Sequence, residues 1–105
     1  MAVRVCRTDE LAEGALARAT LDGVHVAVAR HRGVVHAFSA ICPHQRHDLS
    51  DGFIADEGVT CNSHLWHFEF ATGRCTLIPG ASIPVYPVRE EDGWVVVELP
   101  VELGG

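Results

Sequence analysis

The first third of this 105-residue chain consists of short runs in which apolar and polar residues alternate. Residues 25–30 alternate with the period of two that predicts a β-strand with one face toward a core, and 3–5, 15–20 and 34–38 also predict strands. Asp22-Gly23 and Arg32-Gly33 lie between these runs and indicate tight turns. Residues 8–14 allow at most one helical turn, which a glycine would close. The pattern predicts consecutive strands joined by tight turns.

The rest of the chain also predicts short strands joined by turns. Residues 86–89 and 94–99 flank a Glu91-Asp92-Gly93 turn and predict a second hairpin, while 52–54, 58–60 and 68–70 predict three shorter strands. No helical period of useful length and no internal repeat is present. We therefore expect an all-β fold within one domain, 1–105. Its base would be a small antiparallel β-barrel or sandwich formed by about 1–40 and 81–105, and about 41–80 would form an inserted two-loop metal-binding subdomain.

Size and composition limit the possible functions. A chain of 105 residues can bury one modest core, which leaves no room for a separate catalytic domain. No apolar run approaches the length of about 18 residues that a membrane span needs, so no membrane association is expected. The first residues lack the apolar core of a signal peptide, which favours a cytoplasmic protein.

Charge is distributed unevenly along the chain. All eight basic residues are arginine, against fourteen acidic residues, and the formal net charge is −6. Ten of the acidic residues but only two of the arginines follow Arg46. This balance argues against nucleic-acid binding. The acidic second half suits either electrostatic steering toward a basic partner or a simple solvated surface, and charge alone does not separate the two.

The candidate metal-binding residues lie in one stretch of the chain. Cys42-Pro43-His44 is followed, after the sixteen residues 45–60, by Cys61-Asn62-Ser63-His64. Two thiolates and two imidazoles in two separated short segments indicate a metal site.

The close spacing of Cys42 and His44 indicates which metal the site would hold. Structural zinc sites normally leave two to four residues between paired ligands, whereas Cys42 and His44 leave one. Residues two apart in an extended segment stand about 6 to 7 Å from each other, which is awkward around one ion and suits two neighbouring ions. A two-iron cluster fits if Cys42 and Cys61 bind one iron while His44 and His64 bind the other, which is the Rieske arrangement. A zinc site that uses His47 or His67 instead remains an alternative.

These residues resemble the cluster motif of Rieske [2Fe–2S] proteins, in which C-P-H precedes C-x-x-H by a similar distance. Gln45, together with His64-Leu65-Trp66 and the following Phe68, is similar to the small Rieske ferredoxins of bacterial diiron aromatic monooxygenases of the toluene 4-monooxygenase kind. Ferredoxins of ring-hydroxylating dioxygenases are the next nearest likeness. The resemblance extends from Val3 to about Leu99.

The resemblance implies an electron carrier rather than an enzyme. Such a ferredoxin holds one Rieske [2Fe–2S] cluster, with Cys42, His44, Cys61 and His64 as iron ligands. It would pass single electrons from an NADH-dependent reductase to the diiron hydroxylase of an aromatic or alkene monooxygenase, or to a ring-hydroxylating dioxygenase. Its partners would dock transiently at the cluster tip, in the region of His44, His64, Trp66 and Pro79, and the carrier would be a monomer.

Two other functions remain alternatives. Rieske-like small subunits of nitrite reductase have a similar length, and a zinc-binding interaction module would use similar ligands. The colour of the protein distinguishes the zinc-binding module from a cluster protein, because an iron–sulfur cluster absorbs visible light and zinc does not.

The residues next to the motif have expected roles as well. Leu65, Trp66, Pro43 and Pro79 are expected to shield the cluster, with Pro79-Gly80 in a third loop over it. His67 is expected to line the rim of the site.

The remaining histidines and cysteines lie farther from the motif. His25, His31 and His36 are expected to be surface residues or satisfied residues of the base. Cys6 and Cys75 are expected to be small apolar core residues.

Overall fold

The fold was analysed in a computed structural model, which describes residues 2–21, 23–41, 48–62 and 65–99. The strands found there are β1 (Ala2–Arg7), β2 (Leu16–Leu21), β3 (Val24–His31), β4 (Val34–Ser39), β5 (Phe53–Ala55), β6 (Gly58–Thr60), β7 (His67–Glu69), β8 (Val85–Tyr86), β9 (Val88–Glu91) and β10 (Trp94–Glu98). Two 3₁₀ helices of three residues each, η1 (Thr8–Glu10) and η2 (Leu49–Asp51), complete this part of the chain. The predicted all-β fold is confirmed.

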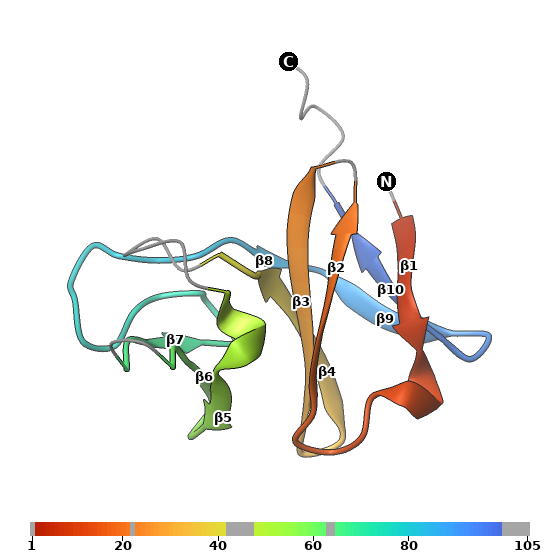
Figure 1. The fold of residues 1–105 in the computed structure, drawn as a ribbon, viewed down its shortest axis with the longest axis horizontal. Coiled ribbons are helices and arrows are strands. Elements are labelled where there is room, and N and C mark those ends of the chain that lie inside the picture. The colour runs from red at the N-terminus through yellow and green to blue at the C-terminus, as the bar shows by residue number, and fades with distance from the viewer. Residues whose placement is uncertain (1, 22, 42–47, 63–64, 100–105) are drawn as a thin grey trace.

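Three antiparallel sheets form three layers. Their strand orders are β1-β10-β9, β2-β3-β4-β8 and β5-β6-β7. Figure 1 shows the four-stranded sheet in the middle, with β1, β10 and β9 on one side and β5 to β7 on the other. Among the described residues, no helix has the length and apolar character that a membrane span requires.

Strand β3 separates two apolar cores. Its residues Val26 and Val28 pack into a core with Val95 and Val97 of β10. The alternate residues Ala27 and Ala29 face a second core. All four of these β3 side chains are fully buried, at 0% exposure. A strand of an antiparallel sheet usually buries one face, so burial of both faces places β3 at the centre of the molecule.

The second core joins the middle sheet to β5, β6 and β7. Its members are Ala27, Ala29, Phe38, Ala40, Leu49, Val59, Cys61, Phe68, Phe70 and Ile83. The middle sheet contributes mainly alanines, which leave space for the large rings of Phe68 and Phe70 from the facing segment. Small residues opposite large ones let the layers interdigitate at the density of a protein interior.

The tight turns of the base follow the sequence signals. Arg32 and Gly33 both have positive φ, at 54° and 77°, and so do Asp92 and Gly93, at 53° and 81°. Two consecutive positive φ values are typical of the two-residue type I′ turn, which matches the twist of a hairpin. The hairpins β3–β4 and β9–β10 therefore form where they were predicted.

The expected strand over 86–89 is wrong in one respect. The chain divides at Pro87, so that β8 pairs with β4 in the middle sheet and β9 pairs with β10 in the outer sheet. Proline has no N–H to donate to a ladder, although its carbonyl accepts a hydrogen bond from the Glu98 amide at 2.9 Å. Pro87 thus marks the point where the chain changes sheets.

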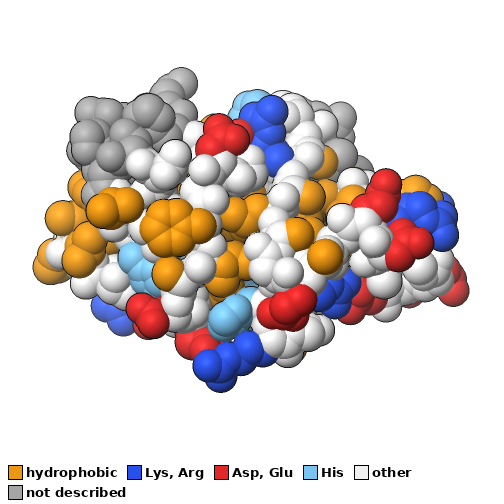
Figure 2. Space-filling model, turned by 60° about the horizontal axis from the view of Figure 1, so that its bottom comes forward, with side chains coloured by type: hydrophobic (Ala, Val, Ile, Leu, Met, Phe, Trp, Pro, Cys, Tyr) orange, Lys and Arg blue, Asp and Glu red, His pale blue; other side chains and the backbone are white. Residues whose placement is uncertain are grey.

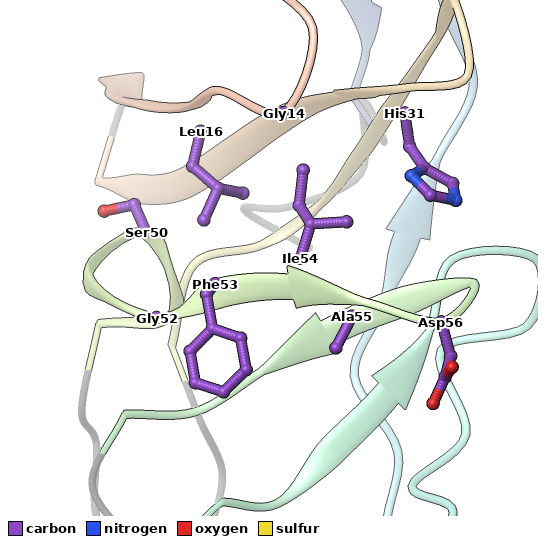
Figure 3. Close-up of a pocket in the computed structure, with 9 residues that line it drawn as sticks. All are labelled: Gly14, Leu16, His31, Ser50, Gly52, Phe53, Ile54, Ala55 and Asp56. Carbon is purple, nitrogen blue, oxygen red and sulfur yellow. The ribbon is translucent and has the colours of Figure 1, made fainter.

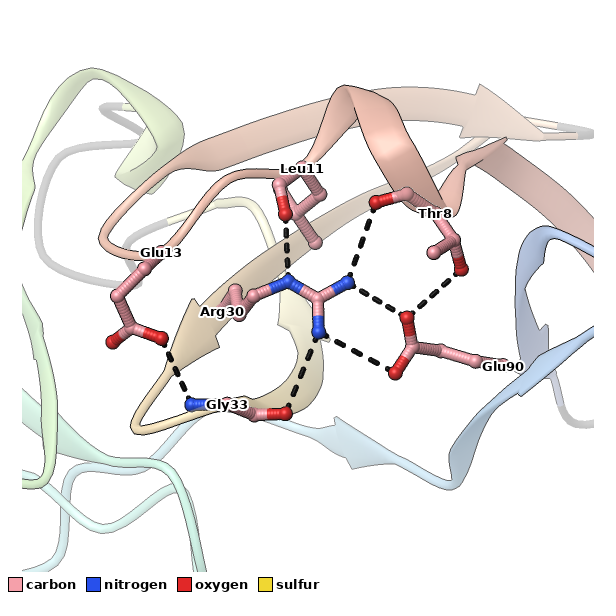
Figure 4. A network of polar contacts seen from close by, with 6 residues as sticks. All are labelled: Thr8, Leu11, Glu13, Arg30, Gly33 and Glu90. Atoms are coloured by element: carbon pink, nitrogen blue, oxygen red, sulfur yellow. Dashed lines mark hydrogen bonds and ion pairs between the residues drawn. The ribbon is translucent and has the colours of Figure 1, made fainter.

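A polar network ties the base together around Arg30 (Figure 4). The Arg30 Nε donates to the carbonyl of Leu11 at 2.6 Å, and its Nη2 lies 2.7 Å from Glu90 Oε1. The hydroxyl of Thr8 donates to the same carboxylate oxygen at 2.8 Å. The Arg30 side chain is 15% exposed and the Glu90 side chain 36% exposed, so this contact joins β3, η1 and β9 where solvent still screens the ion pair in part.

We expect Glu90→Gln to reduce stability in a pH-dependent way. The Arg30 guanidinium, and after it the Thr8 hydroxyl, lower the pKa of the Glu90 carboxyl below its ordinary value of 4.5. A carboxyl whose pKa is lower in the folded state stabilises the fold at neutral pH and loses that effect as pH falls through the folded pKa. Urea unfolding should show Glu90→Gln about 1 kcal/mol less stable at pH 7, with the gap closing toward pH 3.

The control for this experiment is Asp9→Asn, which removes an exposed carboxylate near the same turn and should leave stability nearly unchanged. A gap between wild type and Glu90→Gln that stays constant from pH 7 to pH 3 would contradict the assigned role of the ion pair.

Candidate metal centre

Cys61 is the one predicted iron ligand that lies in the described part of the chain. It directly follows β6, its side chain is 2% exposed, and it belongs to the same apolar core as Leu49 and Ile83. The other three predicted ligands, Cys42, His44 and His64, lie outside the described residues. Within the described residues, no group of three or more side chains suited to holding a metal ion is found.

The segment that precedes η2 is anchored on both sides of residues 42–47. Ile41 and Asp48 form an antiparallel bridge, and the Leu49 amide donates to the carbonyl of Ala40 at 2.6 Å. The Asp48 carboxylate accepts the Ser50 amide at 2.8 Å and contacts Arg18 of β2 at 2.5 Å. These contacts fix the two ends of the first predicted ligand loop against the middle sheet.

The second predicted ligand loop is closed at its base. The Cys61 amide donates to the carbonyl of Trp66 at 2.8 Å, and the Leu65 amide donates back to the carbonyl of Cys61 at 3.0 Å. Leu65 has a φ of +61°, in the left-handed region that a bulky residue rarely adopts. This conformation costs about 1 to 2 kcal/mol, so the short loop is held by contacts that outweigh the strain.

The two loop bases lie together at one end of the β5–β6 pair. Phe53, the first residue of β5, pairs with Thr60, the last residue of β6. Gly52 approaches so closely that an added Cβ would stand 2.0 Å from the Thr60 carbonyl oxygen. The chain therefore leaves the first loop and enters the second at the same edge of the sheet.

A third loop extends from that same edge. Residues 73–75 run beside 81–83, where the Cys75 amide donates to the carbonyl of Ala81 at 2.9 Å. The Thr76 amide donates to the carbonyl of His67 at 2.8 Å, and His67 pairs with Thr60. Residues 76–80, including Pro79, thus leave the sheet beside the second ligand loop, as expected for a third loop.

Exposed apolar side chains gather on these loops. Leu65, Leu77 and Ile78 are 57%, 58% and 39% exposed, and we call them the tip patch. Figure 2 shows hydrophobic side chains crowded at the end of the molecule that carries the third loop, on the left as in Figure 1. Of the residues expected to shield the site, Leu65 and Pro79 are exposed, Trp66 packs partly against the second core, and Pro43 lies outside the described residues, so the shielding stays a prediction. Apolar residues in predicted loops are the sole signal of this patch in the sequence.

The ring of His67 packs along β6. Its Nδ1 is 3.2 Å from the Thr60 hydroxyl, and an added Cβ on Gly58 would stand 2.8 Å from its Nε2. The ring therefore lies along β6 toward Gly58, away from Cys61. The expected rim position and the alternative in which His67 replaces a metal ligand stay predictions, because Cys42, His44 and His64 lie outside the described residues. His47 lies outside the described residues.

The three histidines of the base contact neighbouring side chains, although the buried Nε2 of His31 has no hydrogen-bond partner among the described residues. His25 Nδ1 lies 2.9 Å from the Thr20 hydroxyl. His36 stacks on Phe70 at 4.3 Å between ring centroids, and burial above all lowers the pKa of His36. His31 Nε2 lies 3.3 Å from Glu57 Oε1 without a hydrogen bond, so that contact becomes an ion pair only when His31 is protonated.

The remaining cysteines are partly buried. Cys6 packs against the core of the base and Cys75 against the second core, and neither forms a disulfide. Burial, followed by the charge of Glu10, raises the pKa of the Cys6 thiol, which disfavours its reactive thiolate. The expected role as small apolar residues holds for both, although each sits at the edge of a core.

A cleft of about 550 Å³ separates the base from β5 (Figure 3). Leu16 and Ile54 point toward each other across it, while Phe53 and Asp56 point away. Its polar residues Ser50, His31 and Asp56 lie at separate corners and do not converge on one point. The cleft is a seam between two layers and offers no constellation of catalytic groups.

The described residues fit an iron–sulfur group in the expected place. A free, buried cysteine stands at the end of a strand, next to two loop bases that are anchored at a single edge. A thiol held in apolar surroundings at a loop base suits a soft metal, and the exclusion of bulk water there would favour the bound group.

Comparison with known proteins gives a consistent result. The profile of the Rieske [2Fe–2S] domain family matches residues 1–87. The ferredoxin component of the alkene monooxygenase system of Xanthobacter autotrophicus is 30% identical over 90% of this chain and 79% of that protein. The ferredoxin component of the naphthalene 1,2-dioxygenase system of Pseudomonas aeruginosa is 31% identical over 86% of this chain and 88% of that protein.

Solved structures share the fold. The ferredoxin of carbazole 1,9a-dioxygenase from Nocardioides aromaticivorans is 29% identical, covers 92% of this chain and 96% of its own, and has a TM-score of 0.83. A structure described as a putative NADH-dependent nitrite reductase small subunit from Mycobacterium tuberculosis is also 29% identical, covers 96% and 97%, and has a TM-score of 0.88.

The base of the third loop should depend on Gly73. Gly73 and Gly33 have the same φ of +77°, but an added Cβ at Gly73 would stand 2.0 Å from the Ile83 carbonyl oxygen, whereas one at Gly33 would meet nothing within 4 Å. Gly33→Ala should therefore cost about 1 kcal/mol of left-handed strain. Gly73→Ala should cost about 2 kcal/mol more, because the backbone must move. Urea unfolding measures both, and equal losses would refute the close approach.

Proposed function

This chain belongs to the Rieske [2Fe–2S] domain family, and we propose that it is a one-electron carrier between a reductase and a terminal oxygenase. The observation that supports this most directly is the coincidence of a buried Cys61, two anchored loop bases and an exposed apolar patch at one end of the fold. The named relatives are ferredoxin components of oxygenase systems, which are electron-transfer proteins rather than the oxygenases themselves.

The proposed ligand set is Cys42 and Cys61 for one iron, and His44 and His64 for the other. When bound, a Rieske [2Fe–2S] cluster accepts and releases one electron at a time. The chain supplies the thiolate of Cys61 from a water-poor core and holds the loop ends in place. Replacement of two thiolates by neutral imidazoles reduces the negative charge at the site, which raises the reduction potential.

The domain division is also a proposal. We assign about 1–40 and 81–105 to a base and about 41–80 to a cluster-binding subdomain, within a single Rieske domain of 1–105. The sheet order supports this division, because among the described strands β5, β6 and β7 form a sheet of their own whereas β8, β9 and β10 return to sheets that contain strands from the start of the chain.

The tip patch is the proposed docking face for both partners, together with Trp66, Pro79 and the loops that bear His44 and His64. Apolar residues at the centre of an interface exclude water, and a face shared by two partners requires transient binding. We propose that one partner is an NADH-dependent ferredoxin reductase and that the other is the diiron hydroxylase of an aromatic or alkene monooxygenase. A monomer in the cytoplasm suits this exchange.

Two further candidates each have a specific observation in their favour. The naphthalene dioxygenase ferredoxin is as similar to this chain as the alkene monooxygenase ferredoxin, so a ring-hydroxylating dioxygenase is the second candidate for the terminal partner. The similarity to a nitrite reductase small subunit makes that complex the third. The test is to measure NADH-driven product formation with each purified terminal component, in the presence and absence of this protein. The terminal component that requires this protein identifies the partner among the three candidates.

The ligand assignment predicts unequal effects of two neighbouring histidines. His64→Ala should abolish the visible absorption and the rhombic EPR signal of the cluster, because one iron loses a ligand. His67→Asn should retain both signals, because His67 contacts Thr60 and Gly58 of β6. Loss of the signals in His67→Asn with retention in His64→Ala would transfer the ligand role to His67 and refute the assignment.

The docking proposal predicts that the tip patch contributes to electron transfer but not to stability. Leu65→Ser and Leu77→Ser should each slow reduction of the terminal oxygenase at limiting protein by about fivefold, which corresponds to about 1 kcal/mol of interface energy. Val34→Ser is the matched control, since Val34 is 55% exposed but lies at the β3–β4 turn. Equal losses in all three variants would contradict docking at the tip, and stopped-flow spectroscopy provides the rates.

A further inference from the structure

A second exposed feature lies on the outer face of the β1-β10-β9 sheet. Residues that face each other across an antiparallel pair share a face, so Arg7 lies on the same side as its partner Trp94. Arg4, three residues earlier, would lie on the opposite side in a regular strand. A bulge between Arg4 and Cys6 inserts one residue and brings Arg4 back to the face of Trp94.

Both arginines contact the indole ring. The guanidinium carbons of Arg4 and Arg7 each lie 5.1 Å from the centroid of the Trp94 ring, within the range of a cation–π contact. A guanidinium that stacks by its plane keeps the N–H groups at its edge available. We call Arg4, Arg7 and Trp94 the arginine platform.

The platform arginines differ from most others in the chain. Four of the seven arginines in the described residues contact a carboxylate, namely Arg18 with Asp48, Arg30 with Glu90, Arg32 with Glu57 and Arg89 with both Glu91 and Glu98. Within those residues, Arg4 and Arg7 contact none. The nearby Glu10 carboxylate accepts the backbone amide of Arg7 at 2.8 Å and forms no ion pair with its guanidinium. Two cations on one aromatic ring are thus left without an anion in an acidic protein.

We propose that the arginine platform binds carboxylates of an acidic segment in a partner protein. Two guanidinium edges held at one ring match the planar, two-oxygen geometry of carboxylates. The net charge of −6 opposes a long polyanion such as nucleic acid, whereas a short acidic segment meets only the local positive charge. Charge complementarity therefore selects a peptide with clustered Asp or Glu.

The position of the platform fits a role in holding the carrier. The β1-β10-β9 sheet lies across the middle sheet from β5, β6 and β7 (Figure 1). A partner bound to the platform would leave the tip patch free, so the same complex could retain the protein while its electron-transfer end docks elsewhere. This role in retention rests on the proposed function, whereas carboxylate binding by the platform does not.

The structural alternative is that the two arginines only stabilise the β1–β10 pair. Each exposed cation–π contact is worth about 0.5 to 1 kcal/mol, which suffices to explain stacking without any ligand. A measurement of carboxylate binding distinguishes the two roles, because arginines that only stabilise the strand pair need not bind a carboxylate.

The test is titration of the ¹⁵N-labelled protein, with its iron–sulfur cluster loaded, with hexaglutamate at low salt, followed through the Trp94 indole N–H signal. We expect a saturable shift that weakens as salt is added. The double variant Arg4→Gln/Arg7→Gln should bind at least tenfold more weakly, while Arg74→Gln, which removes an exposed arginine outside the platform, should bind as wild type does.

Two outcomes would overturn the proposal. One is the absence of a saturable shift of Trp94 in the wild-type protein, and the other is equal weakening in the Arg74→Gln variant. If the double glutamine variant does not fold, Arg4→Lys/Arg7→Lys keeps the charge but removes the planar edge, and unchanged affinity in that variant would refute the platform. Because hexaglutamate binding needs neither reductase nor oxygenase, this result is independent of the electron-carrier proposal.

Discussion

Burial of β3 on both faces is the constraint on which the rest of the structure depends. Val26 and Val28 close the core of the base, while Ala27 and Ala29 form the floor of the second core. The central residues of a strand in this position, 26–29, must be apolar, and the side chains of its two faces must differ in size because they meet different layers. The alanine face admits the rings of Phe68 and Phe70, and so brings β5, β6 and β7 close enough to bury the thiol of Cys61.

The arrangement of the site follows from that layer. The pairing of β5 with β6 and of β6 with β7 places the start of β5, the end of β6 and the start of β7 at one edge. Three loops leave this edge, and each is closed at its base by backbone hydrogen bonds. Anchored loop bases at the end of a sheet suit an electron carrier, whose metal ligands must reorganise little when an electron arrives.

The two exposed features on opposite sides of the molecule have different physical character. The tip patch is apolar and includes Leu65, which is exposed and has a left-handed backbone conformation held by the hydrogen bonds at the base of its loop. The arginine platform is cationic and is created by a bulge that brings Arg4 and Arg7 to one ring. An apolar face supports transient contact near the electron-transfer end, and a charged face supports salt-sensitive capture elsewhere.

The sequence by itself determined the local structure and the chemistry. Alternation and glycine turns predicted the strands of the base to within one or two residues, and the spacing of Cys42, His44, Cys61 and His64 indicated the Rieske family. Only the tertiary structure decided which sheet each strand joins, as in the division of the chain at Pro87, and where a side chain points, as in the turn of His67 toward Gly58. These features depend on contacts between residues distant in sequence, whereas alternation and turn signals act over a few residues.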